Sequence, residues 1–141
     1  MKFKPEKKRF LASCILASVA LTLEFGGLHS GAYVYGPYPL KLFGVPISVV
    51  VGWVLVAFVA FKISVKKGVI FGVLGAYAVD LFLEPIAFYT GAWTWTTPYT
   101  AQIYFGSTIG NLVVWILMCY LGVRVFSKVD TEGKTGIKEI G

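Results

Sequence analysis

Residues 68–88 read GVIFGVLGAYAVDLFLEPIAF, an apolar stretch whose only charged side chains are Asp80 and Glu84. A helix needs about 20 predominantly apolar residues to cross about 30 Å of hydrocarbon, and this stretch supplies them. Three more apolar runs of similar length cover residues 10–28, 45–61 and 105–125. The sequence therefore predicts an all-α, polytopic membrane protein built as a bundle of four transmembrane helices.

The composition agrees with a chain that lies almost wholly in a membrane. Of the 141 residues, 57% are hydrophobic and 14% are charged, whereas globular domains average about 45–50% apolar and about 25% charged residues. We expect residues 1–126 to form one four-helix transmembrane domain, with no separate soluble domain. Residues 127–141 carry alternating charges and three glycines, and we expect a disordered cytoplasmic tail there.

The basic residues are distributed unevenly between the two sides of such a bundle. Only Lys41 falls in an outer loop, and all other lysines and arginines precede the first run, separate the second from the third, or close and follow the fourth. Cytoplasmic segments carry the excess of Lys and Arg, so we expect a multi-pass protein of the cell membrane with both termini in the cytoplasm. We expect no nucleic-acid partner, because the basic residues form no single surface interleaved with aromatics.

The N-terminal segment also has features of a secretory signal peptide. Basic residues, an apolar stretch and a small-residue motif at Ser18-Val19-Ala20 follow one another, as they do in cleaved signals. Cleavage would leave three spans and remove most of the helix that precedes Glu24. We therefore expect an uncleaved membrane anchor.

Three carboxylates lie within the predicted spans, namely Glu24, Asp80 and Glu84. An ionisable group at mid-span costs at least about 2.5 kcal/mol, so such residues usually serve chemistry or transport. With a rise of about 1.5 Å per residue, Glu24 and Glu84 lie about 21–24 Å from the cytoplasmic edge, and Asn111 lies at nearly the same depth. The sequence predicts one polar layer in the outer half of the membrane. Its alternative role is structural, with hydrogen bonds that only hold the helices together.

Asp80 and Glu84 are four residues apart, which places both carboxylates on one face of the same helix. Two carboxylates this close in a dry environment cannot both ionise cheaply, so one should hold a proton near neutral pH, and we favour Asp80. Pro85 lacks an N–H and would free the carbonyl of Leu81. We therefore predict that Asp80, Glu84 and Glu24 form the catalytic group.

The two outer loops are rich in Gly, Pro, Tyr and Trp. Tyr and Trp favour the headgroup level of a membrane, so the loops form either an aromatic belt or, in addition, a cap over a lipid-facing opening. A single histidine gives no basis for a metal site, and no cofactor-binding fingerprint occurs, so we expect neither a metal nor a cofactor. Substrate-binding roles are predicted for residues of the loops and the polar layer: Asn111, Tyr35, His29, Trp93 and Trp95.

Two glycine pairs have the GxxxG spacing that favours close packing of helices in apolar segments. They are Gly68 with Gly72 and Gly106 with Gly110. We expect helix contacts at both pairs, in the third and fourth spans.

Several short motifs follow one another between residues 24 and 115. They are EFGG at 24–27 with HSGAYVYG at 29–36, GVPI at 44–47 with Trp53, DLFLEP at 80–85, WTW at 93–95, and YFG at 104–106 before Asn111 and Trp115. This ordered set resembles the carotenoid biosynthesis membrane proteins that include the carotenoid 1,2-hydratases and bisanhydrobacterioruberin hydratase. The resemblance implies a hydro-lyase that acts on a hydrophobic isoprenoid or carotenoid substrate within membrane lipid.

The predicted acids suit that chemistry. Hydration of an isolated C=C bond requires a general acid to protonate one carbon and a base-assisted water to attack the other. Aromatic faces such as Trp93, Trp95 and Tyr35 could stabilise the intervening cation. Members of the family are generally longer, so this chain corresponds to their motif-bearing core, and a homo-oligomer is one way to complete it.

Two other functions are compatible with the sequence. A small proton-coupled multidrug-type transporter also has four short spans and a glutamate in the first, but such transporters commonly need a weak charge bias. A non-catalytic lipid-binding subunit would need only the glycine pairs and the aromatic loops. Proton-dependent efflux would identify a transporter. A lipid-binding subunit would be identified if neutralising the three acids changed stability but no chemical conversion.

Overall fold

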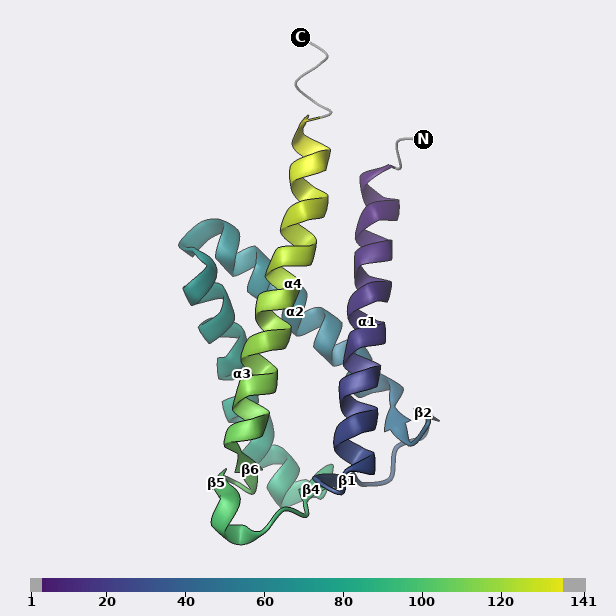
Figure 1. The fold of residues 1–141 in the computed structure, drawn as a ribbon, viewed down its shortest axis with the longest axis vertical. Helices are drawn as coiled ribbons and strands as arrows, with labels where there is room; N and C mark the ends of the chain where they lie inside the picture. Colours follow the sequence, from purple (N-terminus) through teal and green to yellow (C-terminus); the bar gives the residue numbers. More distant parts are fainter. Residues whose placement is uncertain (1–3, 136–141) are drawn as a thin grey trace.

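A computed structural model describes residues 4–135 of the chain, and it is mostly helical. Four of its helices are long and apolar enough to cross a membrane. They are α1 (Pro5–His29), α2 (Ile47–Lys67), α3 (Val69–Thr90) and α4 (Ile109–Thr135). In Figure 1, α1 and α4 run roughly along the long axis of the molecule, and α2 is strongly tilted from it. The predicted four-helix transmembrane fold is confirmed.

Both predicted boundaries of the last helix are wrong. Helix α4 begins at Ile109 rather than Phe105, because Phe105 and Gly106 adopt positive φ angles of 46° and 86° in a tight turn. The helix then continues to Thr135, so residues 127–135 do not form the disordered tail that we expected. Arg9 of α1 donates a hydrogen bond of 2.6 Å to Asp130 on this extension, which helps to hold it. The remainder of the predicted tail, residues 136–141, lies outside the described residues.

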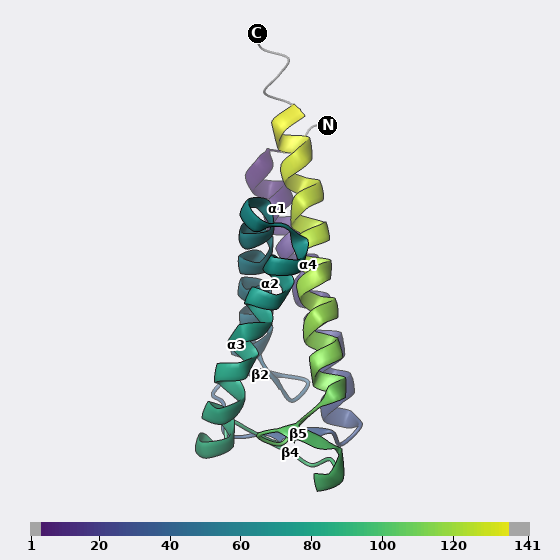
Figure 2. The same cartoon turned by 90° about the vertical axis from the view of Figure 1, so that its left-hand side faces the viewer.

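The helices pack tightly at the end of the bundle where α1 begins and α4 ends. There a cluster of buried side chains joins α1, α2 and α4: Ala12, Leu16, Ala57, Phe61 and Phe126. Figure 2 shows that α3 and α4 diverge toward the opposite end, where the strands lie. Many large apolar side chains, such as Phe82 at 74% exposed, point away from the bundle, as expected for a surface that faces lipid.

Of the four glycines in the two predicted pairs, only Gly72 lies at a close contact with another helix, where it faces Ala60 and Ser64 of α2. Gly106 lies in a turn, and Gly68 has a φ of 98° at the junction of α2 and α3. A second close approach, which the pairs did not predict, is at Gly122, which faces Ala57. The interfaces thus follow the general preference of membrane helices for small residues.

Short strands, which the sequence did not lead us to expect, organise both outer loops. Strand β1 (Tyr33–Tyr35) pairs antiparallel with β4 (Trp93–Trp95), so the two loops are hydrogen bonded to each other. Each loop also forms a small hairpin: β2 (Lys41–Leu42) with β3 (Val45–Pro46), and β5 (Gln102–Tyr104) with β6 (Ser107–Thr108). A short 3-10 helix, η1 (Tyr99–Ala101), precedes the second hairpin.

The element order contains a repeat. Helix, strand, hairpin and helix follow one another in α1-β1-β2-β3-α2 and again in α3-β4-β5-β6-α4, with η1 added in the second half. The hairpin turns match in conformation, since Phe43 and Gly44 have φ angles of 53° and 85° and Phe105 and Gly106 have 46° and 86°. Helices α1 and α3 run in the same direction (Figure 1), so the halves are parallel repeats.

Equivalent residues of the two halves meet at the centre of the molecule. In the β1–β4 pair Val34 lies opposite Thr94, which occupies the same place in the second strand. Trp53 of α2 and Trp115 of α4 likewise stack at a ring distance of 4.5 Å. An approximate two-fold axis therefore passes between the halves, and the residues around it are drawn from both.

Gly72→Ala should destabilise the bundle by about 1–3 kcal/mol, as overpacking of a tight contact does. The added Cβ would lie 2.4 Å from the backbone carbonyl oxygen of Ala60, which cannot move aside alone. Gly26→Ala in α1 is the matched control, because no atom lies within 4 Å of its added Cβ. This control should stabilise the protein by up to about 1 kcal/mol. Thermal unfolding in detergent measures both, and an unaffected Gly72→Ala variant would contradict the α2–α3 contact.

Candidate active site

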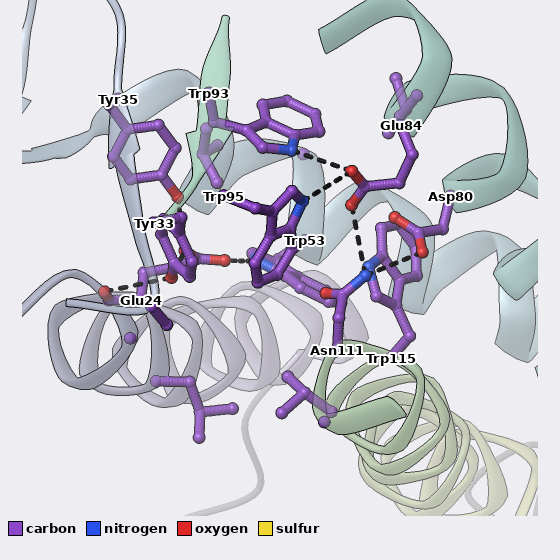
Figure 3. A pocket seen from close by; sticks show the side chains of 18 of the residues that line it. Glu24, Tyr33, Tyr35, Trp53, Asp80, Glu84, Trp93, Trp95, Asn111 and Trp115 are labelled. Carbon is purple, nitrogen blue, oxygen red and sulfur yellow. Dashed lines mark hydrogen bonds between the residues drawn. The ribbon is translucent and has the colours of Figure 1, made fainter. Parts of the chain in front are cut away.

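A cavity of about 540 Å³ lies between the diverging helices and the strands. All four helices contribute to its wall, with Glu24 from α1, Trp53 from α2, Asp80 and Glu84 from α3, and Asn111 from α4. Figure 3 shows Glu24 on one side and the Asp80 and Glu84 carboxyl groups on the other, with indole rings between them. The structure thus brings together the three carboxylates and the asparagine that the sequence places in one polar layer.

Glu24 is held by three side-chain donors from two different elements. The hydroxyl of Tyr33 donates to Oε2 at 2.5 Å, that of Tyr35 donates to the same oxygen, and Trp53 Nε1 donates to Oε1 at 2.5 Å. The indole N–H can only donate, so Oε1 must act as an acceptor. This carboxyl group, 9% exposed, therefore has partners for both of its oxygens.

The two tyrosines are themselves buried beside Glu24. Burial first, and then the charge of Glu24, raise the pKa of Tyr33 and of Tyr35 well above the ordinary value of 10.0. Their rings lie edge to face at 5.4 Å, and Trp95 lies 5.2 Å from Tyr33. Both hydroxyls consequently keep their protons and remain donors at any physiological pH.

Glu84 repeats this arrangement in the second half of the chain. Trp93 and Trp95 donate their indole N–H groups to Oε2 at 3.2 and 2.9 Å. In both halves the two aromatic donors follow the glutamate by nine and eleven residues. With this spacing, the aromatic donors on each strand reach back to the glutamate near the end of the preceding helix.

The second half adds a polar group that the first half lacks. Asn111 Nδ2 lies 3.0 Å from Asp80 Oδ2, 3.3 Å from Glu84 Oε1 and 2.8 Å from Ser107 Oγ. An amide has only two hydrogens for these three oxygens. Asn111 thus connects both carboxyl groups to the hairpin that precedes α4.

Asp80 and Glu84 are neighbours one helical turn apart on α3. Both are almost fully buried, at 3% and 2% exposed, and the amide nitrogen of Asn111 contacts both carboxyl groups. The cavity wall therefore holds two adjacent carboxyl groups bridged by one amide.

Helix α3 continues through Pro85, and the backbone carbonyl that this proline frees has a partner. The hydroxyl of Tyr104 donates to the Leu81 carbonyl oxygen at 2.7 Å. Tyr104 belongs to β5, so the bond ties the second hairpin to the helix that carries both acids. The sequence predicted the free carbonyl but not the residue that occupies it.

His29 does not join the predicted substrate-binding residues around the cavity. Its ring stacks on Phe25 at 3.9 Å and its Nδ1 lies 2.9 Å from the Phe25 carbonyl oxygen, outside the cavity wall. Tyr35, Trp93, Trp95 and Asn111 do line the cavity.

Sequence reasoning gave no site role to Tyr33 or Trp53, both of which bind Glu24. For Tyr33 the signal was present, because its spacing from Glu24 equals that of Trp93 from Glu84.

The described cavity wall contains carboxyl groups but no cationic side chain. Among the described residues that line it there is no Lys, Arg or His. Nor do the described residues include a group of three or more His, Cys, Asp or Glu side chains placed to hold a metal ion. The polar and aromatic groups that the described lining offers are carboxyl groups, hydroxyls, an amide and indole rings.

Comparison with known proteins does not place the chain in a family. No protein-family model matches it, and no match was found among the curated proteins or the solved structures.

Tyr104→Phe should destabilise the protein by about 1 kcal/mol, because the Leu81 carbonyl loses its hydrogen bond. In a Pro85→Ala background the restored N–H at position 85 would donate a hydrogen bond to the Leu81 carbonyl. Tyr104→Phe should then lower the free energy of unfolding markedly less. A double-mutant cycle on the free energy of unfolding tests the coupling. Equal losses in the two backgrounds would show that the carbonyl does not depend on Tyr104.

The tyrosine pair predicts a loss of stability in alkali. Unfolded tyrosines release their protons near pH 10, whereas folded Tyr33 and Tyr35 retain theirs because their pKa is raised. Unfolding is therefore favoured progressively as the pH rises above about 10. A Tyr33→Phe/Tyr35→Phe variant should lose less stability than the wild type between pH 8 and pH 11, and parallel losses would exclude this linkage.

Proposed function

We propose that this chain is an integral membrane enzyme of isoprenoid or carotenoid biosynthesis that adds water to a terminal C=C bond by acid–base chemistry. The proposal is carried by one observation: Asp80 and Glu84, one helical turn apart and bridged by Asn111, line an apolar cavity inside a membrane-spanning bundle. The ordered motifs between residues 24 and 115 support the choice of substrate class.

The pair supplies both proton-transfer steps of a hydration. Asp80 transfers its proton to the less substituted carbon of the double bond, which leaves a tertiary carbocation on the other carbon. A water molecule attacks that carbon, and Glu84 accepts one of its protons, so a tertiary alcohol forms. The proton then returns from Glu84 to its neighbour Asp80, and one water has been consumed.

Neighbouring residues orient the pair for these roles. Trp93 and Trp95 both hold Oε2 of Glu84, while Asn111 contacts Oε1 and also Asp80 Oδ2. Fixed donors of this kind cost no reorganisation when charge moves during the reaction. At least one of these hydrogen bonds would have to break before the Asp80 or the Glu84 carboxyl group could rotate away from the other.

The size of the cavity suits part of a substrate rather than a whole long chain. Cavities of about 300–1,000 Å³ typically enclose ligands of drug size, and this one measures about 540 Å³. The end of an isoprenoid chain would occupy the cavity while the remainder extends into lipid. Because Lys and Arg concentrate at the opposite end of the bundle, we place that end in the cytoplasm and the cavity in the outer half of the membrane.

Asp80→Asn should lower product formation by at least about a hundredfold, since general acid catalysis typically contributes 10²–10⁴-fold. Glu84→Gln should have a comparable effect. Asp130→Asn is the matched control, because it removes a carboxylate that pairs with Arg9 far from the cavity. Lipid extracts of cells expressing each variant, compared for isoprenoid products heavier by one water, give the readout.

Three outcomes would overturn the assignment. Unchanged turnover by a folded Asp80→Asn variant would remove Asp80 from the reaction. Wild-type cells without a hydrated product would exclude a hydratase acting on the isoprenoids present. Proton-dependent efflux from vesicles, without any chemical conversion, would identify a transporter instead.

A further inference from the structure

The two halves of the chain provide an internal comparison of their glutamates. Glu24 and Glu84 occupy equivalent places, and each accepts hydrogen bonds from two aromatic side chains of the following strand. The position one helical turn before each differs, because Ala20 precedes Glu24 whereas Asp80 precedes Glu84. Glu24 therefore has no carboxyl neighbour on its own helix with which to share a proton.

The second helix of each half differs in the same way, with an apolar residue in the first half and a polar residue in the second. Four residues before the stacked tryptophans, the first half has Val49 and the second half has Asn111. Where Asn111 contacts one oxygen of Glu84, the indole N–H of Trp53 donates to the corresponding oxygen of Glu24. The first half thus surrounds its glutamate with donors alone, the arrangement that suits an ionised carboxylate.

An anion at this site has no cationic partner among the described residues that line the cavity. The described cavity wall contains no Lys, Arg or His, and a buried charge is costly unless it is paired or fully hydrogen bonded. All four tryptophans of the chain line the same cavity, together with Tyr33 and Tyr35. Aromatic faces beside a carboxylate form a favourable environment for an organic cation shielded from water.

We propose that the cavity is a binding site for a positively charged apolar group and that Glu24 is its fixed counter-charge, distinct from the proton-exchanging pair Asp80 and Glu84. The inference rests on the proposed function in one respect, because the charged group there is the tertiary carbocation formed from the substrate. Glu24 then stabilises the cation from one side of the cavity while the acid that created it lies on the other. Stable lipophilic ammonium ions should occupy the same place.

The test uses the purified full-length protein in detergent and two probes of equal shape. One is a geranyl trimethylammonium salt, and the other is its neutral isostere with a tert-butyl group in place of the trimethylammonium group. Binding is followed by tryptophan fluorescence, which reports directly because every tryptophan of the chain lines the cavity. We expect the cation to bind at least about tenfold more tightly than the isostere.

Variants assign this preference to one carboxylate. Glu24→Gln should abolish the preference while leaving the affinity for the neutral isostere unchanged, and Glu24→Asp, which retains the charge, should preserve most of it. If Glu24→Gln does not fold, Asp80→Asn/Glu84→Gln provides the test, because Glu24 is then the only acid among the described lining residues. The preference should survive in that double variant.

Two results would overturn the inference: equal binding of the two probes by the wild type, or a preference that disappears in Asp80→Asn/Glu84→Gln and survives Glu24→Gln. Failure of the proposed function is recognised separately, since it concerns turnover. A chain that prefers the cation but forms no hydrated product retains the cation site and loses the hydratase assignment. A chain that forms the hydrated product but binds both probes equally retains the hydratase assignment and loses the cation site.

Discussion

A carboxyl group inside a membrane must find all of its hydrogen-bond partners within the protein, because lipid offers none. This requirement connects most of the features around the cavity. Each glutamate receives two aromatic donors from the strand that follows its helix, nine and eleven residues later. These donors hold β1 and β4 against the helix ends, and the pairing of β1 with β4 then joins the halves. The loops that look like an interfacial belt therefore also supply hydrogen-bond partners to the buried carboxyl groups.

The repeat explains how one framework carries two chemical environments. The parts that build the framework are the same in both halves: the glutamate, the two aromatic donors, the turn with positive φ and the stacked tryptophan. Differences in chemistry include the positions where Ala20 and Val49 in one half correspond to Asp80 and Asn111 in the other. Those differences give one half two adjacent carboxyl groups bridged by an amide and leave the other with a single carboxyl group held by donors.

The packing of the bundle supports this division between framework and chemistry. Membrane helices gain little from burying apolar surface against one another, so they depend on close contact at small residues. Such contacts, at Gly72 and Gly122, bring α2 against α3 and α4. Toward the strands the helices diverge, and a cavity about 540 Å³ in volume lies between them. A tight end and an open end thus allow a stable bundle to hold space for an apolar ligand.

The sequence by itself determined the four spans and predicted that the three carboxylates lie near one level of the bundle, because hydrophobic length and a regular helical rise are local properties. It also determined that Pro85 would free the Leu81 carbonyl. Tertiary structure alone decided that Tyr104 would occupy that carbonyl, that Tyr33 and Trp53 would bind Glu24, and that His29 would lie outside the cavity. These contacts depend on the direction in which irregular loops return over the helix ends. The β1–β4 pairing sets that direction, and it joins strands too short to show any period in the sequence.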